Sequence, residues 1–278
     1  MSDEHTHTGL AADLALMARP LPRRDVLAWL ATALTIPILG CGEDKGADSG
    51  GGDTGLGDPT DTGDSATWDD TCSVIPEETA GPYPGDGSNG PNALTLDDIV
   101  RSDIRSSVGA LSGTAEGVGL KVRMRLVNAS DGCTPLAGYA IYLWHCDRDG
   151  DYSLYTNTSQ NYLRGVQVTD ADGVVSFTTI FPGCYSGRWP HIHFEVYPSL
   201  ADTSSSRNVV ATSQLAMPED SCALVYAVSG YEASVPNFAS ASLDTDNVFS
   251  DGADTQLPAM SGDPSAGLVA TITVGIAV

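Results

Sequence analysis

Between residues 120 and 276 the sequence alternates short apolar segments with turn-forming residues, a pattern that limits the fold more than any other feature. Residues 120–126 show it best, because apolar side chains alternate there with Lys121, Arg123 and Arg125. This alternation predicts a strand with one buried face. Asp-Gly and Pro-Gly pairs punctuate the region and favour tight turns. The other segments predicted as strands are 139–144, 165–169, 174–180, 191–197, 209–217 and 268–276.

Many short strands joined by short turns predict a mainly β fold, an antiparallel β-sandwich with short helical segments. One of these segments is expected at residues 95–105, with Thr95 as its N-cap.

The N-terminal region predicts export. Arg23 and Arg24 precede an uncharged apolar run at 26–40, which is too short to span a bilayer comfortably but suits a signal peptide. The arginine pair resembles a twin-arginine signal, and Ile-Leu-Gly-Cys41 resembles a bacterial lipobox. We therefore expect residues 1–41 to be an export signal with lipidation at Cys41. The protein would be a membrane-anchored lipoprotein facing the periplasm or the cell exterior.

Residues 42–71 consist largely of Gly, Asp, Thr and Ser, which cannot bury enough apolar surface to order a chain. They predict a disordered tether. Residues 72–278 are then expected to form the catalytic domain. Acidic residues outnumber basic ones 36 to 13, for a net charge of −23. Such a balance excludes nucleic acid as a partner and argues against polybasic membrane adhesion.

The cysteines indicate an oxidised domain. Lipidation of Cys41 would leave Cys72, Cys133, Cys146, Cys184 and Cys222. Outside the cytoplasm, two disulfides and one free thiol are the natural expectation. Cys133 and Cys146 flank a predicted strand, so they lie too far apart to pair with each other.

His191 and His193 are two residues apart in a predicted strand, so their imidazoles point to the same face. Ile192, Phe194 and Val196 point to the opposite face, into a core. Two imidazoles on one strand face form half of a transition-metal site.

The other ligands are not obvious from histidines alone. The chain has five, of which His5 and His7 belong to the predicted signal. A zinc hydrolase using His145 with the His191 and His193 pair remains an alternative. Two tyrosines close to motif residues, Tyr152 and Tyr185, are the other candidate ligands.

Taken together, these motifs resemble the intradiol ring-cleavage dioxygenases, the family of protocatechuate 3,4-dioxygenase and catechol 1,2-dioxygenase. The resemblance runs in family order through most of residues 72–217. It is carried by Thr79-Ala-Gly-Pro-Tyr83, Trp144-His-Cys-Asp-x-Asp-Gly-x-Tyr152, Leu163-Arg-Gly165, Thr169-Asp-x-Asp-Gly173, Phe177-x-Thr-Ile-x-Pro-Gly-x-Tyr185 and Arg188-x-x-His-Ile-His193.

The resemblance implies that Tyr152, Tyr185, His191 and His193 bind Fe(III), whose charge two phenolates and a hydroxide would cancel. A catechol would displace hydroxide and Tyr185, and O2 would open the ring to a cis,cis-muconate-type diacid.

The resemblance also implies roles for two further residues. Arg188 would stabilise charge developing on the substrate, and Gln214 would line the pocket. Only Ser186 and Gly187 separate Tyr185 from Arg188, so the substrate preference of the protocatechuate enzymes does not transfer. The alternative on the same fold is a non-catalytic anchored module that binds phenols or metal.

Overall fold

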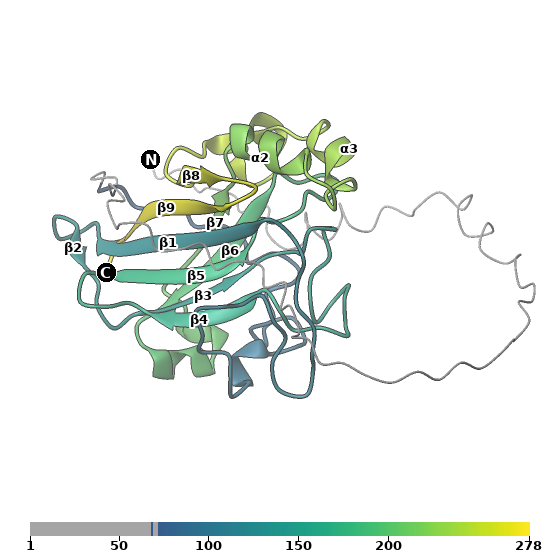
Figure 1. The fold of residues 1–278 in the computed structure, drawn as a ribbon. Coiled ribbons are helices and arrows are strands. Elements are labelled where there is room, and N and C mark those ends of the chain that lie inside the picture. The colour runs from purple at the N-terminus through teal and green to yellow at the C-terminus, as the bar shows by residue number, and fades with distance from the viewer. Residues whose placement is uncertain (1–67, 69–71) are drawn as a thin grey trace, which may run out of the picture.

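The structure is a computed structural model that describes Trp68 and residues 72–278. Two β-sheets lie face to face in it (Figure 1). One sheet has the order β2 (Thr134–Pro135), β1 (Gly119–Asn128), β9 (Gly267–Ile276) and β8 (Ala259–Asp263), and β5 (Val174–Ile180) also pairs with β1. The other has the order β4 (Arg164–Val168), β3 (Ala140–Trp144), β6 (His191–Tyr197) and β7 (Ala211–Ala216).

These sheets confirm the predicted mainly β sandwich. All strand pairs are antiparallel except β1 with β9, which run parallel. Strands at 174–180 and 191–197 have the predicted bounds, and the other five predicted strands differ only at their ends. The short strands β2 and β8 were not predicted, because neither sequence alternates apolar with polar residues.

The main core lies between the sheets. Leu120, Val122, Met124 and Leu126 of β1 are buried there, as the alternation predicts. Ile192, Phe194 and Val196 of β6 face them across the core, also as predicted, and are fully covered. Each such side chain contributes about 1.5–3 kcal/mol through burial.

The opposite face of the β4-β3-β6-β7 sheet is covered as well. All seven residues of β6 are buried, whichever face they occupy. Tyr142 and Trp144 of β3 pack on this covered face in a second cluster with Tyr152, Val166 and Tyr197. Polar side chains that point outward from β6 are therefore shielded from water.

The predicted helix at 95–105 is wrong. A 3-10 turn, η1 (Ala93–Thr95), lies there instead, and its N-cap is Asn92, whose side chain accepts from Leu94 N. The chain that follows is extended, because its backbone bonds to two strands. Arg101 N donates to Val166 O at 3.0 Å, and Ile104 N donates to Thr178 O at 2.9 Å. Pairing with the sheets thus outweighs the local helical signal.

Short helices occupy the segments on both sides of β7. They are η2 (Leu200–Ser204), η3 (Ser206–Asn208), α2 (Glu219–Tyr226), α3 (Ser234–Phe238), η4 (Leu243–Thr245) and η5 (Phe249–Asp251). Glu219 and Asp220 in the first turn of α2 complement the helix dipole. Among the described residues, no helix combines the length and the apolar character needed to cross a membrane.

Cys72 and Cys133 form a disulfide, whereas Cys146, Cys184 and Cys222 are free and buried. The expectation of two disulfides is therefore wrong for the described residues. The three thiols pack as small apolar groups instead, each near a backbone carbonyl oxygen. The predicted signal at 1–41, lipidation at Cys41 and the 42–71 tether lie outside the described residues, apart from Trp68.

Candidate metal centre

Tyr152, Tyr185, His191 and His193 point their donor atoms at one place. Tyr152 comes from the loop after β3, Tyr185 from the loop before β6, and both histidines from β6. His191 Nε2 lies 3.3 Å from Tyr152 Oη, 3.1 Å from Tyr185 Oη and 3.1 Å from His193 Nε2. The two phenol oxygens are 3.4 Å apart.

Hydrogen bonding alone does not account for this convergence. His191 Nδ1 lies 2.5 Å from Trp189 O, so Nδ1 carries the proton and Nε2 has a single lone pair. Three donor atoms nevertheless crowd around that lone pair. Separations of 3.1–3.4 Å suit four ligands around one ion, each about 2 Å from it. The donor set therefore fits a single metal ion.

The protonation states also fit a metal ion. Burial, reinforced by the charge of Arg188, lowers the pKa of His191 well below its ordinary value. Burial, reinforced by His191, does the same to the pKa of His193. Both rings are therefore neutral, the form that binds metals. Burial raises the pKa of Tyr152, so its phenolate needs a cation beside it.

A backbone contact brings the two tyrosine loops together. Gly183 N donates to Asp147 O at 3.0 Å. A Cβ at position 183 would lie 2.6 Å from Arg148 O, so only glycine permits this approach. The Asp147 carboxylate then holds the Tyr152 loop in shape, since it accepts from Asp149 N, Asp151 N and Tyr162 Oη.

Arg188 and Gln214 lie together beside the four donors. Arg188 Nη2 donates to Gln214 Oε1 at 2.7 Å, and Gln214 is paired with His193 across β6 and β7. Arg188 Nε also binds Asp246 Oδ2 at 3.0 Å, and both side chains are almost fully buried. The sequence did not indicate Asp246, which lies far from Arg188 along the chain.

His145 does not belong to this group. Its side chain is buried, Nδ1 lies 2.7 Å from Cys146 O, and Nε2 lies 2.7 Å from Thr179 Oγ1. Both nitrogens are thus engaged elsewhere, which removes the geometric basis of a three-histidine site. In the described part of the chain, no three or more His, Cys, Asp or Glu side chains cluster in a way that could hold a metal ion.

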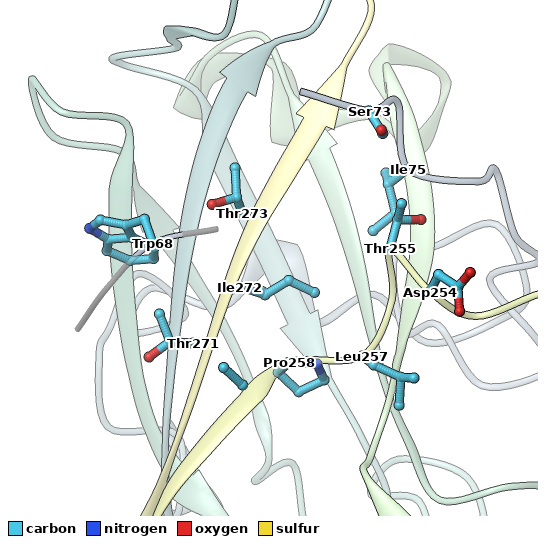
Figure 2. A pocket seen from close by; sticks show the side chains of 11 residues that line it. Trp68, Ser73, Ile75, Asp254, Thr255, Leu257, Pro258, Thr271, Ile272 and Thr273 are labelled. Carbon is cyan, nitrogen blue, oxygen red and sulfur yellow. The ribbon is translucent and has the colours of Figure 1, made fainter. Parts of the chain in front are cut away.

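One surface pocket of about 370 Å³ lies away from these residues. Figure 2 shows Ile272 of β9, Trp68, Leu257 and Pro258 among its lining side chains. It contains none of the six candidate site residues and no histidine. We therefore place the chemistry at the four donors rather than in this pocket.

Comparisons with known proteins bear on this site. Residues 99–201 match the family model described as Dioxygenase. The chain is similar in structure to an intradiol ring-cleavage dioxygenase from Tetranychus urticae. The TM-score is 0.57 and the identity 26%, over 74% of this chain and 95% of that one. Residues 99–201 are thus similar to this dioxygenase family, and the chain shares its fold with an intradiol ring-cleavage dioxygenase.

Two further solved structures are more distant. One is the dioxygenase domain of a dioxygenase carbohydrate-binding protein fusion from Streptomyces sp. SirexAA-E, with a TM-score of 0.48 and 24% identity over 74% and 99% of the two chains. The other is catechol 1,2-dioxygenase from Pseudomonas arvilla C-1, with a TM-score of 0.40 and 19% identity over 65% and 58%. A search of curated proteins finds no match to this chain.

The dioxygenase family match ends before α2 and α3, yet residues 226–237 hold the Tyr185 loop in place. Tyr226 Oη donates to Pro182 O, and Tyr231 Oη donates to Phe181 O. Cys184 N donates to Ser234 Oγ, and Asn237 Nδ2 donates to Cys184 O. These contacts fix the backbone just before Tyr185. No motif in the sequence indicated this role.

Proposed function

We propose that this protein is a non-haem Fe(III) dioxygenase that opens catechol-type rings between the two hydroxyl-bearing carbons. The observation that carries the proposal is the convergence of two phenol oxygens and two imidazole nitrogens within 3.1–3.4 Å of one another. Phenolate is a hard anionic donor suited to a hard ferric ion. When bound, the ion supplies a site where a catechol and O2 react to give a cis,cis-muconate-type diacid.

Tyr152 and Tyr185 differ in a way that supports separate roles. Tyr152 is buried, and its backbone N donates to Thr156 Oγ1 at 2.7 Å. Tyr185 is half-buried and borders the exposed pair Ser186 and Gly187. Tyr185 is therefore the ligand with room to move aside for a catechol. Its phenolate would then take up one of the two protons that the catechol releases.

Arg188 and Gln214 supply directed polar groups at the same place. Asp246 and Gln214 hold the guanidinium of Arg188, so its orientation is fixed before the substrate arrives. A fixed cation stabilises negative charge that develops on a bound ring without having to reorganise. Tyr83, whose ring centroid lies 5.1 Å from that of Tyr152, adds an aromatic wall to this side.

We further propose that the protein is exported and anchored through a lipid on Cys41, as residues 1–41 predict from sequence. Mass spectrometry of the N-terminal peptide from the membrane fraction should show a diacylglyceryl group on Cys41. Cys41→Ser should move the protein into the soluble fraction. An unmodified Cys41 in that peptide would contradict the anchor.

The decisive experiment for the catalytic proposal uses the purified full chain with bound iron. We expect a visible phenolate-to-iron absorption, a spectral shift when catechol is added, and uptake of one O2 for each ring-opened diacid formed. A spectral shift without O2 uptake would favour the non-catalytic binding module. Zinc in place of iron, with no visible absorption, would contradict the ferric site.

A further inference from the structure

The charge of Arg188, the cation that contacts Gln214, is already compensated. Arg188 forms a buried ion pair with Asp246, with 5% of the arginine and 1% of the aspartate side chain exposed. Asp246 Oδ2, which accepts from Arg188, also accepts from Trp189 N. Asp246 Oδ1 accepts from Val248 N and Phe249 N. A carboxylate that accepts this many hydrogen bonds is held in place against Arg188.

A second carboxylate, Glu78, is close enough to this pair to interact electrostatically with both members. Gln256 Nε2 is 3.3 Å from Glu78 Oε1 and 3.1 Å from Gln214 O, so one amide joins Glu78 to the strand that carries Gln214. Gln214 Nε2 in turn donates to Thr79 O, the residue after Glu78. Glu78 therefore borders the Arg188–Gln214 contact instead of facing bulk solvent alone.

The charged groups facing Glu78 are mostly negative. Asp251 of η5 and Asp246 repel its carboxylate, whereas Arg188 attracts it. Burial, with the added repulsion from Asp251, raises the pKa of Glu78 to about 7. Glu78 is thus largely ionised at pH 8.5 and largely protonated at pH 6. When it is ionised, two carboxylates, those of Asp246 and Glu78, act electrostatically on one guanidinium.

The other buried cation does not offset this balance. Arg164 is fully buried and donates five hydrogen bonds to neutral oxygens of Tyr83, Pro84, Tyr142 and Ser153. These five bonds occupy all of its N–H groups, so the guanidinium presents no free donor to a ligand. His191 and His193 are neutral because of burial.

We propose that this site selects catechols without a carboxylate, and that Glu78 is a specificity-determining residue. The proposal rests on the catechol dioxygenase function above. A carboxylate on the ring would enter next to an arginine whose charge Asp246 has compensated and next to the negative Glu78. Like charges at such short range cost substantial binding free energy when they are shielded from water. Specificity would arise mainly from this repulsion.

The test compares two substrates of nearly the same shape, 3,4-dihydroxybenzoate and its uncharged amide, on the iron-loaded full chain. We expect kcat/KM to favour the amide by about tenfold at pH 8.5. The preference should shrink towards pH 6, where Glu78 is protonated. In Glu78→Gln the preference should fall several-fold and lose this pH dependence. The ratio of the two substrates' kcat/KM cancels the general effects of pH on iron or O2 chemistry.

Glu77→Gln is the matched control, because it removes one negative charge from the adjacent, exposed residue. We expect it to keep the wild-type preference and pH dependence. Equal use of both substrates at pH 8.5, or an unchanged preference in Glu78→Gln, would overturn the proposal. If iron binds but neither compound is oxidised, the proposed function fails instead. In that case the dissociation constants of the two compounds can still be measured from the shift in the visible spectrum. Their ratio then tests whether the site selects the uncharged compound.

Discussion

The indole of Trp144 lies flat against the imidazole of His193, with ring centroids 4.9 Å apart and planes 5° from parallel. The two residues are directly paired across β3 and β6. His193 Nδ1 has no hydrogen-bond partner among the described residues, unlike His191 Nδ1. The stack therefore helps to set the rotation of the His193 ring, which aims Nε2 at the other three candidate ligands.

Replacing Trp144 should weaken metal binding through His193. Residues that orient metal ligands typically contribute 10–100-fold in affinity. We expect Trp144→Leu to release iron to a chelator about tenfold faster. Trp144→Phe should be milder, because it keeps an aromatic face and Trp144 Nε1 has no hydrogen-bond partner to lose among the described residues. Equal release rates in all three folded proteins would show that the stack does not orient the ligand.

Tyr152→Phe should remove both iron and the visible absorption. The variant deletes one anionic donor from a buried site but little volume, so the sandwich should still fold. Iron content and the absorption spectrum measure the effect, with circular dichroism as the check on folding. Tyr139→Phe is the matched control, because Tyr139 precedes β3 at the end remote from Tyr152. A Tyr152→Phe protein with full iron and full activity would refute the ligand assignment.

His145 should make the fold sensitive to acid without contributing to metal binding. Burial lowers the pKa of His145 to about 4, whereas its ordinary value is near 6.5. The unfolded chain therefore binds a proton at higher pH than the folded protein does. The contribution of neutral His145 to the free energy of unfolding is fully present above pH 6.5. It is lost as the pH falls to about 4, which amounts to about 3 kcal/mol. Urea unfolding at several pH values should show this loss.

His145→Asn should unfold at lower urea than the wild type at neutral pH, since Thr179 Oγ1 and Cys146 O lose a partner. Its stability should depend less on pH between 6.5 and 4, and its iron content should be unchanged. Loss of iron in a folded His145→Asn protein would revive the three-histidine alternative.

Arg164 should matter for stability more than any exposed arginine. Its guanidinium ties residues 83–84, Ser153 and Tyr142 of β3 to the start of β4 through five hydrogen bonds. Lysine has only three donors and a different geometry, so at least two oxygens would lose a partner. We expect Arg164→Lys to lower the free energy of unfolding by about 3 kcal/mol. Arg207→Lys, on an exposed 3-10 turn, should change it by less than about 0.5 kcal/mol.

The Cys72–Cys133 disulfide closes a loop with a sequence separation of 61 residues. Loop-closure entropy assigns such a crosslink about 4 kcal/mol. Reduction, or Cys72→Ser, should lower the free energy of unfolding by about that amount in urea titrations. Alkylation of the unfolded, unreduced protein should modify Cys146, Cys184 and Cys222 but not the disulfide pair. Alkylated Cys133 in the peptide map would contradict the pairing.

The parts of the fold that the sequence predicted are those governed by local periodicity. Seven strands follow from alternating or continuous apolar residues, because those patterns reflect burial directly. The helix at 95–105 was wrong because its residues bond to β4 and β5, which are distant in sequence. The second disulfide was wrong because composition limits how many cysteines can pair but not which ones face each other.

The candidate site divides in the same way. Tyr152, Tyr185, His191 and His193 were predicted from motifs, and the structure brings their donor atoms together. Asp246, Glu78 and the 226–237 segment were missed, since each acts through a contact between distant stretches of chain. A buried ion pair between Arg188 and Asp246 leaves no pattern that spacing alone could reveal.

The central position of β9 determines when the fold can be completed. In Figure 1 the yellow β9 lies beside β1, and the two strands pair in parallel along their whole length. Among the described residues β9 is the last strand in the sequence, so a nascent chain holds β1 with one edge unpaired until β9 has been made. Pairings of this kind are slow and leave the chain prone to aggregation. A nascent chain that still lacks residues 267–276 should therefore depend on chaperones until β9 can pair with β1.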